Sequence, residues 1–172
     1  MKRYLSLLLV LLFPYFVIFA VECLIEVSLL ETIFQSNPYL LLLALIVICI
    51  VALLSSMIVF IISIVMKWNT KDLLRANMIM KLVHIPAYIG IFLSALACML
   101  TIFTYVISMI IIILACMTIF MSGLIGLAGV IRSAFEKKLS AKEVIIHGIL
   151  QFIFCADIIS SIVIYDNVNK AA

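Results

Sequence analysis

Long, uninterrupted apolar runs separate short polar stretches along the whole chain. A bilayer core about 30 Å thick is crossed by about 20 apolar residues in a helix. Transmembrane strands would alternate apolar and polar positions, whereas residues 40–51 are apolar throughout. The pattern therefore predicts an all-α fold, a polytopic transmembrane helical bundle forming a single domain over 1–172. Its five predicted spans lie near residues 5–21, 39–66, 85–104, 106–131 and 144–165.

Composition excludes the common classes of soluble protein. Hydrophobic residues make up 69% of the 172 residues and charged residues only 11%, and the mean hydropathy is +1.47. A soluble globular domain needs about a quarter charged residues to cover its surface. The net charge of +3 comes from short basic loops, so we expect no nucleic-acid partner. The expected environment is a lipid bilayer.

The basic residues predict an orientation, because Lys and Arg accumulate in the cytoplasmic loops of membrane proteins. Ten of the eleven lie before the first predicted span, after the second or after the fourth. Glutamates at 22, 26 and 31 occupy the loop after the first span. We therefore predict a multi-pass protein of the plasma membrane, with its N-terminus inside and its C-terminus outside. The loop after the second span forms a cytoplasmic basic rim of Lys67, Lys71, Arg75 and Lys81.

Local signals place several helix boundaries. Asn37 followed by Pro38 is typical of an N-cap with proline at the first helical position, and Pro86 predicts a similar start for the third span. Ser140 and Glu143 have the spacing of a capping box, which predicts that the fifth helix begins near Ala141. We expect the turn between the third and fourth spans at 104–108.

The first span has a second interpretation. Lys2 and Arg3, the apolar stretch and the sequence Ile18-Phe19-Ala20 also match the three regions of a signal peptide. Cleavage would leave four spans. We expect the segment to be retained as a membrane anchor.

Small residues recur at helical spacing in two spans, and such seams allow close backbone approach between membrane helices. We predict that the third and fourth spans pack as an antiparallel hairpin, which either holds the bundle together or forms an interface with a partner or substrate. The predicted helix-packing residues are Ala87, Gly90, Ser94 and Ala97 in the third span, and Ser122, Gly126 and Gly129 in the fourth.

Motifs for catalysis or metal binding are missing from the sequence. The five cysteines form no C-x-x-C pair and have no histidine at metal-ligand spacing. We find no H-E-x-x-H motif, no paired intramembrane aspartates and no glycine-rich phosphate loop. We therefore expect no enzyme activity, no catalytic residues, no metal and no cofactor.

The fifth predicted span has one polar face. At 100° per residue, six polar residues fall within an arc of about 120°. They are Glu143, His147, Gln151, Asp157, Ser161 and Tyr165. An ionised Asp157 near the bilayer centre would cost about 3 kcal/mol, and no Lys or Arg lies within another predicted span to pair with it. One interpretation is that this face forms a proton- or ion-responsive site. The alternatives are that its polar groups are hydrogen-bonded to the third and fourth spans, or that the helix lies less deep in the bilayer. The candidate intramembrane polar site comprises His147, Gln151, Asp157 and Ser161.

Three short stretches carry a resemblance to a known group of proteins. His84-Ile85-Pro86-Ala87-Tyr88, residues 122–126 and residues 148–157 resemble small, uncharacterised multi-spanning membrane proteins of Gram-positive bacteria, a domain of unknown function. The resemblance covers about half the chain. It implies a bacterial plasma membrane and supplies no activity.

Taken together, these patterns favour a non-enzymatic accessory or assembly subunit that acts through helix packing. Its partner would be another membrane protein or further copies of the chain. The alternative is a small proton- or ion-responsive transporter or channel that uses the polar face of the fifth span.

Overall fold

The computed structural model describes residues 5–100 and 102–170, and this part of the chain is helical without strands. The predicted all-α class is therefore confirmed. The elements in chain order are α1 (Leu5–Ile25), α2 (Val27–Phe34), α3 (Pro38–Val65), α4 (Thr70–Met99), a short 3-10 helix (Ile102–Thr104), α5 (Tyr105–Phe135), α6 (Ala141–Leu150) and α7 (Ala156–Lys170).

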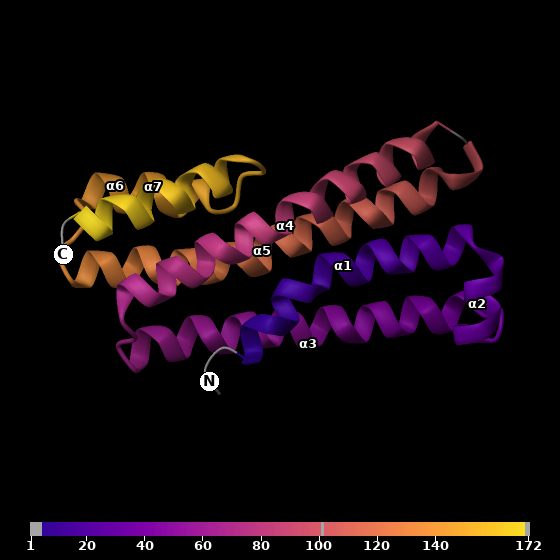
Figure 1. The fold of residues 1–172 in the computed structure, drawn as a ribbon, viewed down its shortest axis with the longest axis horizontal. Helices are drawn as coiled ribbons and strands as arrows, with labels where there is room; N and C mark the ends of the chain where they lie inside the picture. Colours follow the sequence, from indigo (N-terminus) through magenta and orange to yellow (C-terminus); the bar gives the residue numbers. More distant parts are fainter. Residues whose placement is uncertain (1–4, 101, 171–172) are drawn as a thin grey trace.

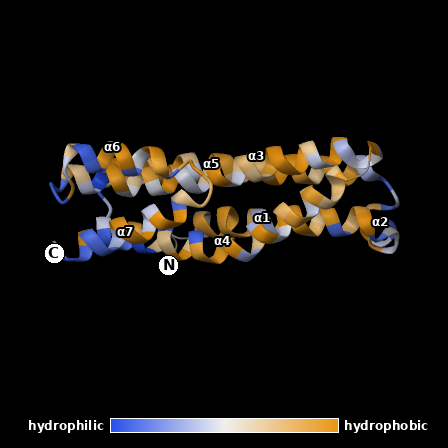
Figure 2. Cartoon of the chain, turned by 90° about the horizontal axis from the view of Figure 1, so that it is seen from above, coloured by the Kyte–Doolittle hydropathy of each residue, from blue (hydrophilic) through white to orange (hydrophobic). Residues whose placement is uncertain are grey.

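Four of the described helices, α1, α3, α4 and α5, are long and apolar enough to cross a membrane. They run along the long axis of the molecule, and each runs antiparallel to the spanning-length helix that precedes it in the chain (Figure 1). Seen at right angles, the helices form two layers, with α3, α5 and α6 in one and α1, α4 and α7 in the other (Figure 2). The main core lies between these layers and includes Val10, Phe13 and Met121.

Two predicted helix starts are confirmed by their caps. The side chain of Asn37 accepts a hydrogen bond of 3.0 Å from the backbone N–H of Tyr39, directly after Pro38. At the start of α6, the backbone N–H of Glu143 donates to the Ser140 hydroxyl at 3.3 Å, and the Ser140 N–H donates to the Glu143 carboxylate at 2.8 Å. The Ser140 hydroxyl also donates to this carboxylate at 2.7 Å, and the two bonds that Ser140 donates to it lower the pKa of Glu143.

Helix α4 begins well before the predicted third span. Its N-cap is Asn69, whose side chain accepts from the N–H of Lys71 at 3.0 Å, and Pro86 lies inside the helix instead of starting it. Proline is tolerated in apolar bundles because neighbouring groups satisfy the freed backbone. The prediction that this helix starts at 85 is wrong, and Lys81 consequently belongs to a long apolar helix.

The turn between α4 and α5 lies slightly earlier than predicted, around the 3-10 helix Ile102–Thr104. Helix α5 begins at Tyr105, and the hydroxyl of Ser108 donates to the backbone oxygen of Ala95 at 2.9 Å. The two helices lie side by side and antiparallel (Figure 1).

The predicted fifth span over 144–165 is wrong as a single helix. It is a hairpin in which α6 and α7 are joined by residues 151–155, and α7 returns to the end of the bundle where α6 began (Figure 1). The turn contains no Gly or Pro, and Cys155 adopts a left-handed conformation with φ 64°. The outside position of the C-terminus rested on a fifth crossing, so it does not follow from this fold.

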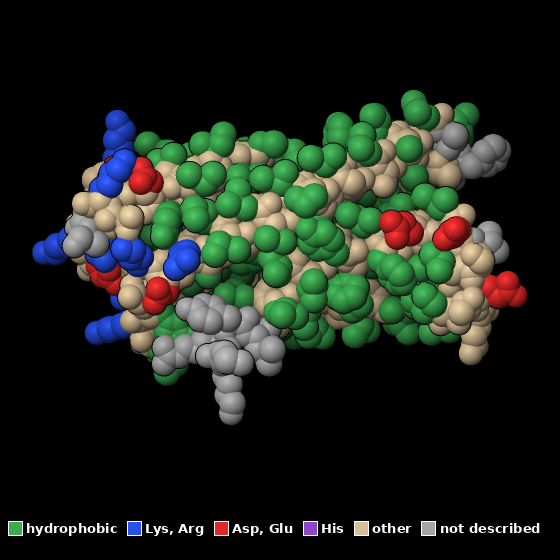
Figure 3. Space-filling view, in the orientation of Figure 1, with side chains coloured by type: hydrophobic (Ala, Val, Ile, Leu, Met, Phe, Trp, Pro, Cys, Tyr) green, Lys and Arg blue, Asp and Glu red, His purple; other side chains and the backbone are tan. Residues whose placement is uncertain are grey.

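Charged side chains gather at the two ends of the molecule, and hydrophobic side chains cover the length between them (Figure 3). Lys and Arg lie at the end that holds the α3–α4 and α5–α6 connections, whereas the exposed Glu22 and Glu26 lie near the other end. Lys2 and Arg3, on which the N-terminal orientation and the signal-peptide interpretation partly rested, lie outside the described residues.

Candidate functional site

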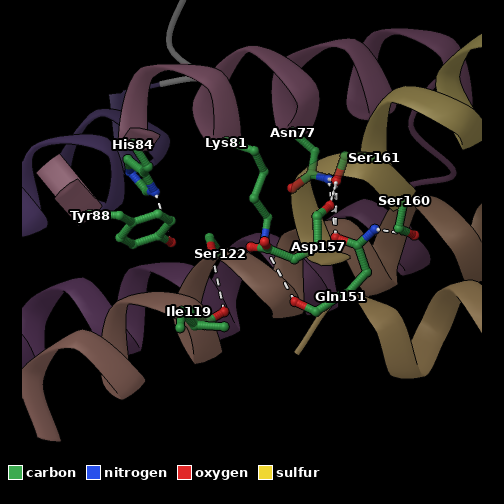
Figure 4. A network of polar contacts seen from close by, with 10 residues as sticks. All are labelled: Asn77, Lys81, His84, Tyr88, Ile119, Ser122, Gln151, Asp157, Ser160 and Ser161. Atoms are coloured by element: carbon green, nitrogen blue, oxygen red, sulfur yellow. Dashed lines mark hydrogen bonds and ion pairs between the residues drawn. The ribbon is translucent and has the colours of Figure 1, made fainter. Parts of the chain in front are cut away.

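Six fully buried polar side chains meet where the α6–α7 hairpin rests on α4 and α5 (Figure 4). Each is at most 1% exposed, although the surroundings are apolar. Burial of so many polar groups is costly unless they bind one another, so such groups mark a candidate site. We call this set the polar cluster; it consists of Asn77 and Lys81 from α4, Gln151 from the turn, and Asp157, Ser160 and Ser161 from α7.

An ion pair lies at the centre of the polar cluster. The Lys81 ammonium group is 2.5 Å from the Asp157 carboxylate, and both side chains are 0% exposed. The ammonium also donates to the backbone oxygen of Gln151, the residue that caps the C-terminal end of α6, at 3.4 Å. Asp157 lies in the first turn of α7. Each charge therefore faces a helix end of opposite partial charge, which stabilises the pair.

Amide and hydroxyl groups extend the cluster around the ion pair. The Asn77 side-chain nitrogen donates to the Ser161 hydroxyl at 2.9 Å and to the Gln151 side-chain oxygen at 3.4 Å. The Gln151 side-chain nitrogen donates to Ser160 at 3.3 Å, and Ser160 also lies 2.9 Å from the ring Nδ1 of the half-buried His147. These bonds join both arms of the hairpin to each other and to α4.

Two acceptor atoms in the cluster have no hydrogen-bond partner. They are Oδ1 of Asp157 and Oδ1 of Asn77, and both are buried. Nearly all buried acceptors in proteins are hydrogen-bonded. The cluster therefore has unused capacity to bind a positively charged or hydrogen-donating group.

Glycines of α5 make room for the cluster. A Cβ atom at Gly126 would lie 2.0 Å from the Gln151 side-chain oxygen and 2.9 Å from the Asn77 side-chain nitrogen. A Cβ at Gly123 would lie 2.9 Å from the backbone oxygen of Gln151. Only a helix without side chains at these positions can support the hairpin turn so closely.

The predicted helix-packing residues are buried in α5 but only partly buried in α4. Ser122, Gly126 and Gly129 of α5 are all buried. In α4, Ala87 is buried but Ser94 is half-buried and Ala97 exposed. A Cβ at Gly90 would contact Ile18 of α1 at 3.1 Å, so this part of the seam faces α1 instead of α5.

The predicted polar site is brought together by the hairpin instead of by one helix face. Gln151, Asp157 and Ser161 lie in the polar cluster, and His147 touches it through Ser160. The expectation that Asp157 has no basic partner is wrong, because Lys81 binds it. Lys81 is therefore not part of the basic rim, whereas Lys67 and Arg75 are exposed and Lys71 is half-buried.

Sequence reasoning missed the contribution of α4. Asn77, Lys81, His84 and Tyr88 recur at spacings of four, three and four, which places them along one helix face. The His84 ring lies 3.2 Å from the backbone oxygen of Leu11 and 3.5 Å from the Tyr88 hydroxyl. This periodicity could have indicated a polar face on α4. It was missed because Pro86 was interpreted as the start of the helix, which placed Asn77 and Lys81 in a loop.

Apolar cavities lie beside the cluster and do not open into it. Two of about 270 and 230 Å³ flank the tip of the hairpin and share Tyr88, Phe92 and Phe154 in their lining. The Tyr88 and Phe154 rings meet edge to face at 5.6 Å. Another cavity of about 270 Å³, between α1, α3 and α5, is lined by aliphatic residues, proline and Tyr39.

Metal-binding groups of three or more His, Cys, Asp or Glu side chains do not occur among the described residues. No protein-family model matches the chain, and neither a curated protein nor a solved structure matches it. The resemblance to small membrane proteins of Gram-positive bacteria therefore stays a prediction.

Proposed function

We propose that this protein is a multi-pass protein of the plasma membrane that works without catalysis, as an accessory or assembly subunit whose helices pack against a membrane-protein partner. Helices α1, α3, α4 and α5 would cross the bilayer. Helix α6 has ten residues, about 15 Å, so the hairpin would enter only half of the bilayer core from the cytoplasmic side. Both ends of the hairpin would then be cytoplasmic.

The closed polar cluster is the observation that carries this proposal. A transport site needs a route for water or solute, whereas the six cluster side chains are at most 1% exposed. The cavities beside the cluster are lined by apolar groups. Apart from Ser160, which also contacts His147, the cluster side chains bond only to one another and to the backbone. This arrangement supports a structural role, in which the cluster holds the hairpin on the bundle.

The outer surface supports a role in packing. Large hydrophobic side chains are exposed along the spanning helices, among them Phe92 at 60% and Leu93 at 56%. Lipid or another apolar helix can cover such a surface, and the hairpin does not extend over the far half of α4 and α5 (Figure 1). A partner helix could pack against this apolar surface of α4 and α5.

The experiment is gentle extraction of a tagged chain from its native membrane, followed by mass measurement of the intact particle. We expect a partner protein in fixed stoichiometry. An established membrane complex from the same cells serves as the control for extraction. A lone monomer, obtained under conditions that keep the control complex intact, would contradict the proposal.

The Lys81–Asp157 pair favours a second candidate, a small proton- or ion-responsive transporter or channel. Ionisable side chains inside a membrane are rare and commonly mark ion pathways. Purified protein in vesicles with a pH-sensitive dye inside would show proton flux above that of protein-free vesicles. Asp157→Asn would abolish the flux, whereas the exposed Asp166→Asn would keep it. Equal proton flux with and without protein rules out proton transport by this protein.

A further inference from the structure

Two oxygen atoms at the break between α6 and α7 bind the Lys81 ammonium group. Asp157 Oδ2 lies at 2.5 Å and the backbone oxygen of Gln151 at 3.4 Å. The buried oxygens without partners, Asp157 Oδ1 and Asn77 Oδ1, belong to the same cluster (Figure 4). Carboxylate, amide and backbone oxygens are the donors that hard metal cations prefer.

We propose that this break is a binding site for a monovalent cation, and that the ammonium group of Lys81 is its tethered occupant. In the native chain the lysine fills the site permanently. Without the ammonium group, the same oxygens would bind an alkali cation such as Na⁺ or K⁺.

The charge of the site fits a single positive charge. Asp157 is the only anionic side chain in the polar cluster, whose amide and hydroxyl groups are neutral. The other titratable groups nearby are His84 and Tyr88 on α4 and His147 on α6, whereas α5 contributes the uncharged Ser122 and Gly126. A buried carboxylate without a counter-charge is strongly unfavourable, so loss of the ammonium leaves a demand for one positive charge, for which an alkali cation competes with a proton.

The helix geometry adds a second attraction. The C-terminal end of α6 presents backbone oxygens with partial negative charge, and Gln151 at this end already binds the ammonium. In membrane transporters, broken helices with such ends commonly coordinate cations. The hairpin turn has the same arrangement, with a half-helix ending beside a buried carboxylate.

A tethered cation has a physical advantage over a free one. The lysine is covalently attached, so the hairpin docks without the entropic cost of capturing an ion. Docking is then independent of the sodium or potassium concentration. This inference goes beyond a packing role, because it assigns a ligand class to the cluster whether or not a partner protein exists.

The test replaces Lys81 by methionine, which retains most of the aliphatic stem and removes the charge. The purified Lys81→Met protein would be melted in detergent with sodium, potassium or choline chloride at equal ionic strength. We expect a melting temperature about 2–4 °C higher in at least one alkali salt than in choline chloride, because a bound cation stabilises only the folded state. The native protein should melt alike in all three salts.

Lys81→Met combined with Asp157→Asn is the matched control, since it also removes the anionic ligand. This double variant should fold and melt alike in all salts. The proposal is overturned if Lys81→Met melts alike in the three salts. It is also overturned if Lys81→Met folds in none of them while the double variant folds, since the oxygens would then accept no free cation.

Discussion

Replacing Gly126 by alanine should destabilise the protein, although alanine is the better helix former. The gain from helix propensity is about 1 kcal/mol. Against it, the new Cβ would lie 2.0 Å from the Gln151 side-chain oxygen and 2.5 Å from its amide carbon. The Gln151 amide is fully buried, so its displacement disturbs bonds inside the cluster.

The magnitude follows from the bonds that are lost. The Gln151 oxygen accepts from Asn77 at 3.4 Å and from Ser161 at 3.2 Å, and each such bond is worth about 1 kcal/mol. Strain from an extra carbon in a packed interior adds about 1–3 kcal/mol. After subtraction of the helix gain, we expect Gly126→Ala to lower the free energy of unfolding by about 2–4 kcal/mol.

Thermal unfolding in detergent measures this difference, and Gly148→Ala is the matched control. A Cβ at Gly148 would lie 3.4 Å from Leu127, an ordinary contact, so this variant should melt about 2–4 °C above the native protein. Gly126→Ala should melt at least 4 °C below it. If Gly126→Ala melts at or above the native temperature, the Gln151 amide does not lie against α5 and the cluster geometry is refuted.

The hairpin and the ion pair make three further predictions. Reporters fused after Ala172 and inserted at residues 137–138 should both be cytoplasmic, and opposite locations would show that 144–165 crosses the membrane. Cys155→Gly should raise the melting temperature, because glycine adopts the left-handed conformation of this turn without strain. In a continuous helix, the same substitution would lower the free energy of unfolding by about 1 kcal/mol. In choline chloride, Lys81→Met and Asp157→Asn should each cost about 3–5 kcal/mol by denaturant unfolding, and the double variant should cost less than their sum; additive losses would mean that the two side chains do not interact.

The long helices could be predicted because apolar runs of sufficient length have few alternatives. Helix α3 was placed within a residue at each end, since Asn37 and Pro38 mark its start and Lys67 follows its end. The α4 boundary could not be predicted in this way. Charged residues such as Lys71, Asp72 and Arg75 suggested a loop, but they form the first turns of α4 outside its apolar part.

The hairpin could not be predicted because its turn contains no helix-breaking residue. Gln151–Cys155 has the composition of a spanning helix, and its fold depends on contacts with residues far away in sequence. Asn77 and Lys81 provide these contacts from α4. The arc of polar residues correctly identified the hairpin residues that belong to the site. The pattern within one segment does not show, however, that their partners lie on α4.

The sequence separation of the central ion pair has a consequence for synthesis. Lys81 precedes Asp157 by 76 residues, so at 5–20 residues per second the ribosome makes the lysine about 4–15 s before its carboxylate. Throughout that interval the Lys81 side chain has no Asp157 partner, and in the proposed bilayer an unpaired ammonium would disfavour insertion of α4 to full depth. If α4 crosses a bilayer as proposed, docking of α7 would compensate this charge, so a chain truncated before Asp157 would keep an unpaired lysine in its apolar part.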